Sequence, residues 1–207
     1  MSQAITGAAP SGKPKKTLKW AIIGVTALVA IAAIVVVLLF VFVYGGDTGK
    51  AKDLVKKSDA LMTKLNSKGD ELGTSLNDLM NNLKTVSSTS DYEQMADKVR
   101  QQTGSIKSDL NSASNGYKEI LEMNGVQKYK EYAREALTLI DVDVQQIKEF
   151  NDYLDYLGSQ FKAAETGQSV SETEVAAETT AFVRKVKSLA PKITYIKSVL
   201  DSLRKGL

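Results

Sequence analysis

The chain has 207 residues, with 27 Lys and Arg against 24 Asp and Glu, so its formal net charge at pH 7 is +3. It contains no cysteine and no histidine, which excludes disulfides, thiolate nucleophiles, serine–histidine catalytic pairs and nearly all zinc sites. Because histidine is also the usual general base, the composition predicts a non-enzymatic protein without a metal or cofactor.

An apolar run without a single charged side chain covers residues 20–44, WAIIGVTALVAIAAIVVVLLFVFVY. As a helix these 25 residues extend roughly 37 Å, which exceeds the ~30 Å hydrocarbon core of a bilayer. Trp20 and Tyr44 stand at its two ends, where amphipathic rings favour the headgroup region. The run is also longer than the apolar core of a cleaved signal peptide. It therefore predicts a transmembrane helix, an uncleaved signal anchor with Trp20 and Tyr44 as membrane-interface anchors.

The two flanks of this run suggest its orientation. Residues 1–19 are polar and contain four lysines and no acid, which predicts a disordered basic tail and favours a cytoplasmic N-terminus. The lysines that follow the run weaken this assignment. Residues 45–49, Gly-Gly-Asp-Thr-Gly, predict a flexible neck. We expect a single-pass protein of the cell membrane with residues 50–207 on its extracytoplasmic side.

Beyond the neck, apolar residues recur at helical spacing as far as the end of the chain. Leucines at steps of three, four and seven predict a first helix over about 50–86. The second is expected to begin at a capping box formed by Ser90 and Glu93 and to end at Asn124-Gly125.

Two further helices complete the domain. The third is predicted over about 126–161, and a polar loop around Gly167 follows it. The fourth begins at a second capping box, Ser171 with Glu174, and runs to about residue 203. Pro191 lies inside it and predicts a kink, because proline lacks the amide and clashes with the preceding turn.

Four long helices joined by short turns predict an all-α fold, an up-down-up-down antiparallel four-helix bundle of coiled-coil-like helices. At 1.5 Å per residue this bundle is roughly 50–55 Å long, and residues 50–207 begin and end at its membrane-proximal end. An alternative is an open coiled coil whose apolar seam is completed by other copies.

The apolar seam is interrupted at matching heights, about twenty residues above the membrane-proximal end at 1.5 Å each. The interruptions are Lys68-Gly69, Gln102-Thr103-Gly104 and Asp143, with Lys185 near the same level. One interpretation is a polar layer that fixes register, with Asp143 paired to Lys68 or Gln102. A second is a stutter that turns Asp143 to water. A third is a pocket for a small ligand or ion.

Charge divides the helical domain into two parts. The membrane-proximal thirds, residues 47–60, 115–135 and 190–207, carry twelve basic against eight acidic residues, whereas the remainder carries eleven against sixteen. The predicted basic cluster lies beside Tyr117, Tyr129, Tyr132 and Tyr195 and comprises Lys118, Lys128, Lys130, Arg134, Lys192, Lys197, Arg204 and Lys205. It predicts either contact with anionic lipid headgroups or an ordinary solvated helical surface.

The layout resembles the membrane-anchored four-helix sensor domains of chemoreceptors and the LemA-type single-anchor helical proteins. A chemoreceptor would need a second span after the fourth helix, which this sequence lacks. We therefore expect a non-enzymatic binding or structural module of the cell envelope that acts on a protein partner or by self-association. Nucleic acid is excluded as a partner because the basic residues alternate with acids. The alternatives are an extracytoplasmic ligand-sensing or solute-binding subunit acting through a partner, and a self-assembling envelope component.

Overall fold

The computed structural model describes residues 49–83, 86 and 88–207. Its fold is all-helical, and the predicted tail, the apolar run with Trp20 and Tyr44, and nearly all of the neck lie outside the described residues. Within the described part of the chain, no helix combines the length and the apolarity that a bilayer crossing needs. The described helices are α2 (Gly49–Asn82), α3 (Thr89–Glu122), α4 (Gln127–Glu165) and α5 (Glu172–Arg204).

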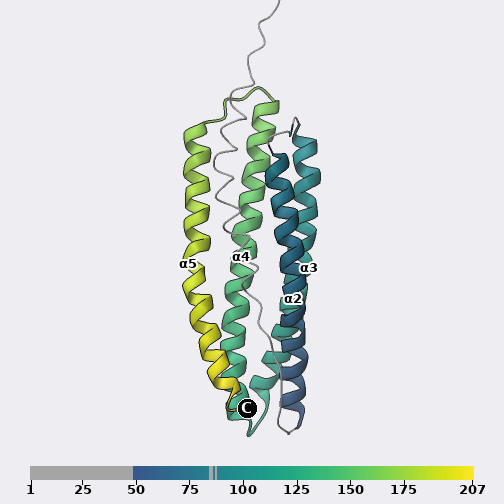
Figure 1. The fold of residues 1–207 in the computed structure, drawn as a ribbon, viewed down its shortest axis with the longest axis vertical. Coiled ribbons are helices and arrows are strands. Elements are labelled where there is room, and N and C mark those ends of the chain that lie inside the picture. Colours follow the sequence, from purple (N-terminus) through teal and green to yellow (C-terminus); the bar gives the residue numbers. More distant parts are fainter. Residues whose placement is uncertain (1–48, 84–85, 87) are drawn as a thin grey trace, which may run out of the picture.

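The four described helices form a bundle in which each runs antiparallel to its neighbour in the chain (Figure 1). Helix α2 packs on α3, α3 on α4 and α4 on α5, and α2 makes a smaller contact with α4. Among these helices, no Cα atom of α5 lies within 8 Å of one in α2 or α3. The backbones of α2 and α5 therefore do not close the ring. We call the end where α2 begins and α5 ends the base, and the opposite end the distal end.

The helix starts show one prediction confirmed and one wrong. Ser171 is the N-cap of α5, and its side chain accepts a hydrogen bond from the Glu174 amide at 3.3 Å. The N-cap of α3 is Ser88, whose Oγ accepts from the Asp91 amide at 3.1 Å. The predicted cap, Ser90, lies within the first turn instead. Ser88 is in the extended conformation that an N-cap requires and precedes an acid at the favoured position, so it competes successfully with Ser90.

Two of the turns depend on glycine, and α5 depends on proline for its shape. Gly125 and Gly167 have φ angles of 75° and 79°, in the left-handed region that favours glycine. Pro191 lies inside α5, and the lower half of α5 is bent as it approaches the base (Figure 1). A missing amide and a ring that presses on the preceding turn are the expected causes of such a bend. The bend directs the last turns of α5 toward the other helices.

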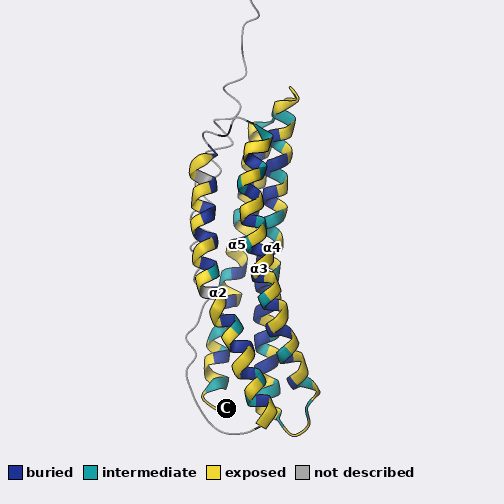
Figure 2. Cartoon of the chain, turned by 90° about the vertical axis from the view of Figure 1, so that its right-hand side faces the viewer, coloured by how far each residue is buried: buried dark blue, intermediate teal, exposed yellow. Residues whose placement is uncertain are grey.

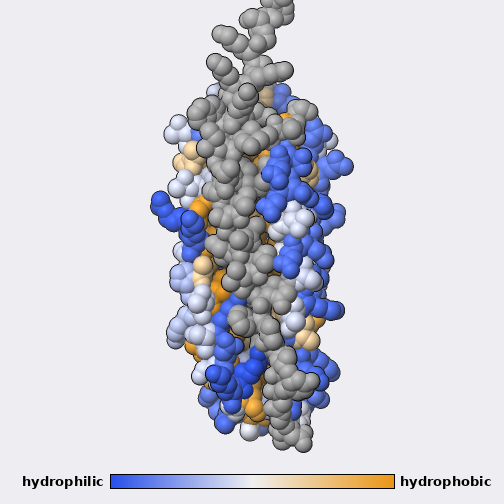
Figure 3. All heavy atoms as spheres, viewed as in Figure 1, coloured by the Kyte–Doolittle hydropathy of each residue, from blue (hydrophilic) through white to orange (hydrophobic). Residues whose placement is uncertain are grey.

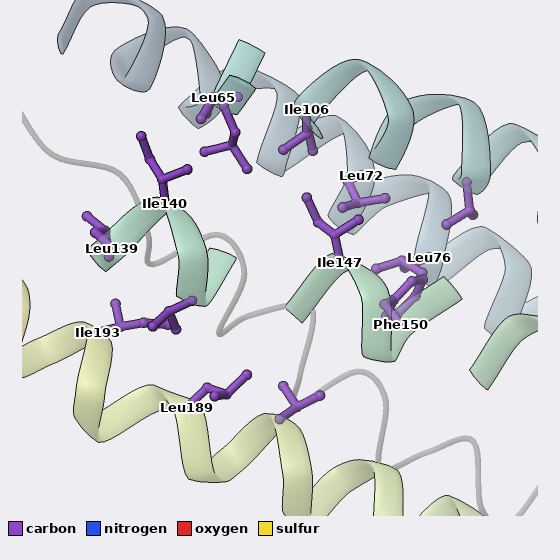
Figure 4. Packing of buried hydrophobic residues seen from close by; sticks show 14 of the residues in the cluster. Leu65, Leu72, Leu76, Ile106, Leu139, Ile140, Ile147, Phe150, Leu189 and Ile193 are labelled. Atoms are coloured by element: carbon purple, nitrogen blue, oxygen red, sulfur yellow. The ribbon is translucent and has the colours of Figure 1, made fainter. Parts of the chain in front are cut away.

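One continuous apolar core follows the inner faces of the helices, and the exposed residues follow their outer faces (Figure 2). In the close-up of the core, Ile147 and Phe150 of α4 face Leu72 and Leu76 of α2, while Leu189 points inward from α5 (Figure 4). Burial of such side chains contributes about 1.5–3 kcal/mol each. The α2–α3–α4 interface and the α4–α5 interface therefore share α4 as their common element.

The described part of the chain exposes few large apolar side chains. On the face in Figure 3, the visible described surface is mostly hydrophilic, with hydrophobic atoms between the charged groups. Among the described residues, Tyr195 is the exposed large hydrophobic side chain, at 68% of its area. A single such residue does not form the contiguous apolar patch that marks many protein interfaces.

Candidate functional site

The interrupted levels of α2, α3 and α4 meet around a small cavity. Its volume is about 40 Å³, and it lies at mid-height because the middle turns of all three helices contribute to it. Most of its lining is apolar, and the polar side chains come from α3 and α4. The lining residues are Leu65, Leu72, Leu76, Thr103, Ile106, Leu110, Asp143, Gln146, Ile147 and Phe150.

Asp143 is the ionisable group of this cavity. Only 5% of its area is exposed, and its Oδ1 has no hydrogen-bond partner among the described residues. Burial raises the pKa of Asp143 to about 8, against the opposing charge of Lys197 on α5. The carboxyl group is therefore mostly protonated and neutral at pH 7. Among the described residues, the pairing of Asp143 with Lys68 or Gln102 that the first interpretation required is not present, since both have other partners.

Gln146 is the second cavity residue whose side chain has no hydrogen-bond partner among the described residues, and the apolar pattern of the sequence did not predict its burial. It is 4% exposed, and neither Nε2 nor Oε1 has a hydrogen-bond partner among the described residues. Its spacing of three from Asp143 places the two side chains on one face of α4. Each buried polar group left unpaired costs about 1–3 kcal/mol. Two such groups at one cavity are therefore a feature that needs an explanation.

Thr103, the remaining polar residue of the lining, is already hydrogen-bonded. Its Oγ1 lies 2.9 Å from the Arg100 carbonyl oxygen and 3.1 Å from Oδ1 of Asn151. The Thr103 hydroxyl therefore donates its hydrogen bond within the protein and links α3 to α4, so it does not donate into the cavity. Among the lining residues, the unpaired hydrogen-bonding atoms belong to Asp143 and Gln146, and Gln102, at the same level but outside the lining, also has an unpaired Oε1.

The other residues of the predicted polar layer tie neighbouring helices together outside the cavity. Lys68 forms an ion pair with Asp109, with Nζ 2.6 Å from Oδ2, and so joins α2 to α3. The Gln102 amide donates to a backbone carbonyl of α2 at 3.4 Å. Lys185, whose side chain is 63% exposed, forms an ion pair with Glu149 at 2.9 Å. The hydrogen bonds and ion pairs of these three residues are to partners other than Asp143.

A second polar group in the core lies at the base, and we call Asp59, Tyr117, Tyr132 and Arg204 the base cluster. Each of the four helices supplies one member. The Tyr117 hydroxyl donates to Oδ1 of Asp59 at 2.5 Å, and the Tyr132 hydroxyl donates to the same oxygen at 3.1 Å. Arg204 donates from Nη2 to Oδ2 at 2.5 Å. This ion pair joins α5 to α2, whose backbones remain apart.

The carboxylate of Asp59 in the base cluster is buried, and its hydrogen bonds and ion pair compensate for the burial. Burial raises the pKa of Asp59, and the Tyr117 hydrogen bond and the Arg204 charge act in the opposite direction. Burial also raises the pKa of Tyr117 and Tyr132, so both stay protonated as donors. The Arg204 guanidinium lies 5.3 Å from the centre of the Tyr132 ring, where a cation is attracted to the aromatic face. We therefore interpret this cluster as a structural tie.

The eight basic residues predicted for the membrane-proximal end have three kinds of environment. Arg204 is bound to Asp59 in the base cluster, and Lys130 and Lys197 are half-buried. Of the four tyrosines beside them, Tyr117 and Tyr132 are buried. The exposed members, which we call the basic rim, are Lys118, Lys128, Arg134, Lys192 and Lys205.

No protein-family model, curated protein or solved structure matches this chain. Within the described ranges there is no group of three or more Asp, Glu, His or Cys side chains arranged to hold a metal ion. The cavity offers hydrogen-bond donors and acceptors in an apolar setting. Its chemistry is therefore suited to recognising a guest by hydrogen bonding and shape.

Proposed function

We propose that this protein is a non-enzymatic helical module of the cell envelope that one membrane span holds against the surface of a bilayer. The observation that carries the proposal is that the base is both the end next to the apolar run and the end with the basic rim. Helix α2 begins at Gly49, a few residues after the run ends at Tyr44. The proposed anchoring segment and the basic charges that suit a lipid surface are therefore at the same end of the domain.

Electrostatics favour the base over the sides of the module as the lipid-facing part. A lysine or arginine near an anionic surface contributes about 1 kcal/mol, and salt screens this attraction over ~8–10 Å. The domain is roughly 50 Å long at 1.5 Å per helical residue, so only the base is close enough for electrostatic attraction to the lipid surface. The sides of the helices remain accessible to a protein partner or to a second copy of the chain.

Fractionation and protease accessibility of the full-length protein test this proposal. We expect it to stay with the membrane in high salt and to need detergent for release, whereas a variant without residues 20–44 enters the aqueous fraction. In spheroplasts, external protease should digest the helical domain and spare a tag placed before Met1. Release without detergent would contradict the span, and digestion of the tag alone would reverse the proposed orientation.

The mid-height cavity favours a second candidate, an extracytoplasmic solute-binding subunit that acts through a partner. A purely structural bundle gains stability from a dry apolar core, and the two unpaired groups of Asp143 and Gln146 work against that stability. A buried polar group without a partner in the protein needs an explanation, and a bound guest molecule is one. The two candidates are compatible, because the basic rim is at the base and the cavity is at mid-height.

A further inference from the structure

We propose that the cavity between α2, α3 and α4 binds a small uncharged molecule whose polar head both donates and accepts hydrogen bonds, such as a short-chain amide. Asp143 and Gln146 are the binding residues. The inference rests on the second candidate function and specifies its class of ligand. It does not depend on the membrane span, which the fractionation experiment tests separately.

The hydrogen-bonding pattern of the two side chains points to this class. The amide of Gln146 presents an N–H donor and a carbonyl acceptor, and all of its capacity is unused among the described residues. Asp143 lies one turn away on the same face of α4 and, when protonated, presents an O–H donor and a carbonyl acceptor. A guest that carries a donor and an acceptor on one head group satisfies both side chains. A molecule that only accepts satisfies half of them.

The surroundings of the cavity disfavour a charged guest. Apart from Asp143, every lining residue from α2, α3 and α4 is uncharged. On α5, Lys197 is the group whose charge acts on Asp143. An ion entering this site would lose its hydration in exchange for one carboxyl group and one amide, which is unfavourable in an apolar setting. An uncharged amphiphile loses much less and places its alkyl part against the leucines and isoleucines.

The volume of the cavity limits both the size and the affinity of the guest. A buried water molecule needs about 10–15 Å³ on this scale, so 40 Å³ accommodates about three or four non-hydrogen atoms. Even the most efficient small ligands gain a limited free energy per atom, which places the dissociation constant for such a guest no lower than about 10⁻⁵ M. Acetamide fits this size, and millimolar titrations are the appropriate range.

The test is a titration of the full-length protein in lipid nanodiscs with acetamide, followed by the thermal unfolding midpoint. A guest that binds the native state raises the midpoint as its concentration exceeds the dissociation constant. We expect Gln146→Leu to weaken binding at least tenfold. Gln145→Leu is the matched control, because Gln145 is the exposed neighbour on the same helix. The comparison of these two variants cancels any general solvent effect of the amide.

Variants of Asp143 and pH provide a second, independent readout. Asp143→Asn keeps a donor and an acceptor and should retain binding, whereas Asp143→Leu should lose it. In the wild type, binding should weaken as the pH rises above about 8, and in Asp143→Asn it should not. An equal response to acetamide in Gln145→Leu and Gln146→Leu, or no response in the wild type, would overturn the proposal and leave water as the only occupant.

Discussion

At the scale of single residues, Asp143 lowers the stability of the fold, and more so at higher pH. Its pKa in the folded protein is about 8, above the ordinary value of 3.8, so between these values the unfolded chain binds fewer protons than the folded one. The free energy of unfolding must then fall with rising pH, by up to about 1.4 kcal/mol per pH unit. We predict that Asp143→Leu removes this dependence and stabilises the protein at pH 7 by several kcal/mol, because it removes both the unpaired buried polar group, at about 1–3 kcal/mol, and the loss that accumulates above the ordinary pKa.

Urea unfolding monitored by circular dichroism at pH 5 and pH 8 measures both effects. Asp141→Leu is the matched control, since Asp141 is exposed two residues away on the same helix, and it should leave the pH dependence unchanged. A wild-type stability that is constant over this range would show that Asp143 ionises normally in the folded protein.

The base cluster leads to the opposite prediction, because its buried charge is compensated. Arg204→Met removes the cation next to Asp59, whose side chain is 9% exposed, and leaves its carboxyl group without a charge partner. We expect a loss of about 3 kcal/mol, which is typical when one partner of a buried pair is removed. Adding Asp59→Asn should recover much of this loss, because no buried charge then remains. The unfolding free energies of the two variants, and of Lys205→Met as an exposed control, provide the comparison.

A contrary result for the base cluster is equally clear. If Arg204→Met and Lys205→Met cost the same, the ion pair does not hold α5 to α2. The link between the C-terminal turn of α5 and the rest of the base would then depend on apolar packing alone.

At the scale of helices, the correction at the start of α3 can be measured directly. The Ser88 side chain accepts the Asp91 amide hydrogen bond, so Ser88→Ala leaves an amide of the first turn unpaired and should cost about 1 kcal/mol. Ser90→Ala removes an exposed serine that does not cap the helix and should be close to neutral. Thermal unfolding of the two variants decides between these caps, and a larger loss for Ser90→Ala would restore the original prediction.

Much of the helical pattern was predictable from the sequence for a physical reason. Apolar spacing identifies which face of a helix is buried, and this is why Asp143, which lies in phase with Ile140 and Ile147, was recognised as an interruption of the core. Capping residues act locally, so Ser171 was recognised from its immediate neighbours. The start of α3 was misplaced because four consecutive Ser and Thr residues, 87–90, offer competing caps, and only the backbone conformation decides among them.

The remaining features depend on contacts between distant parts of the chain. Gln146 was missed because glutamine is usually exposed, and its burial follows from its position on the face of α4 that is directed toward α2 and α3. The base cluster was missed because Asp59 and Arg204 are 145 residues apart. Apolar periodicity also does not specify which helices become neighbours. The separation of the α2 and α5 backbones therefore had no signature in the sequence.

At the scale of the whole molecule, three features are arranged along one axis. The basic rim and the base cluster lie at the base, the cavity lies at mid-height, and the more acidic part of the chain extends toward the distal end. If the base faces anionic lipid, attraction acts on the basic rim, and repulsion of the acidic remainder favours an upright orientation. Salt weakens both effects within a Debye length.

This orientation gives the last prediction, and the absence of native cysteine makes it straightforward to measure. A fluorophore on Asn124→Cys reports on the base, because Asn124 is exposed in the turn between α3 and α4. A fluorophore on Gln168→Cys, in the turn between α4 and α5, is the matched distal control.

In nanodiscs, a headgroup quencher should reach the Asn124 label more efficiently when the lipid is anionic, and added salt should reduce the difference. The Gln168 label, which lies roughly 50 Å away along helices that rise 1.5 Å per residue, should be insensitive to both. Equal quenching at the two sites would mean that the module lies flat on the membrane, and an unchanged Asn124 signal would show that the basic rim does not contact lipid.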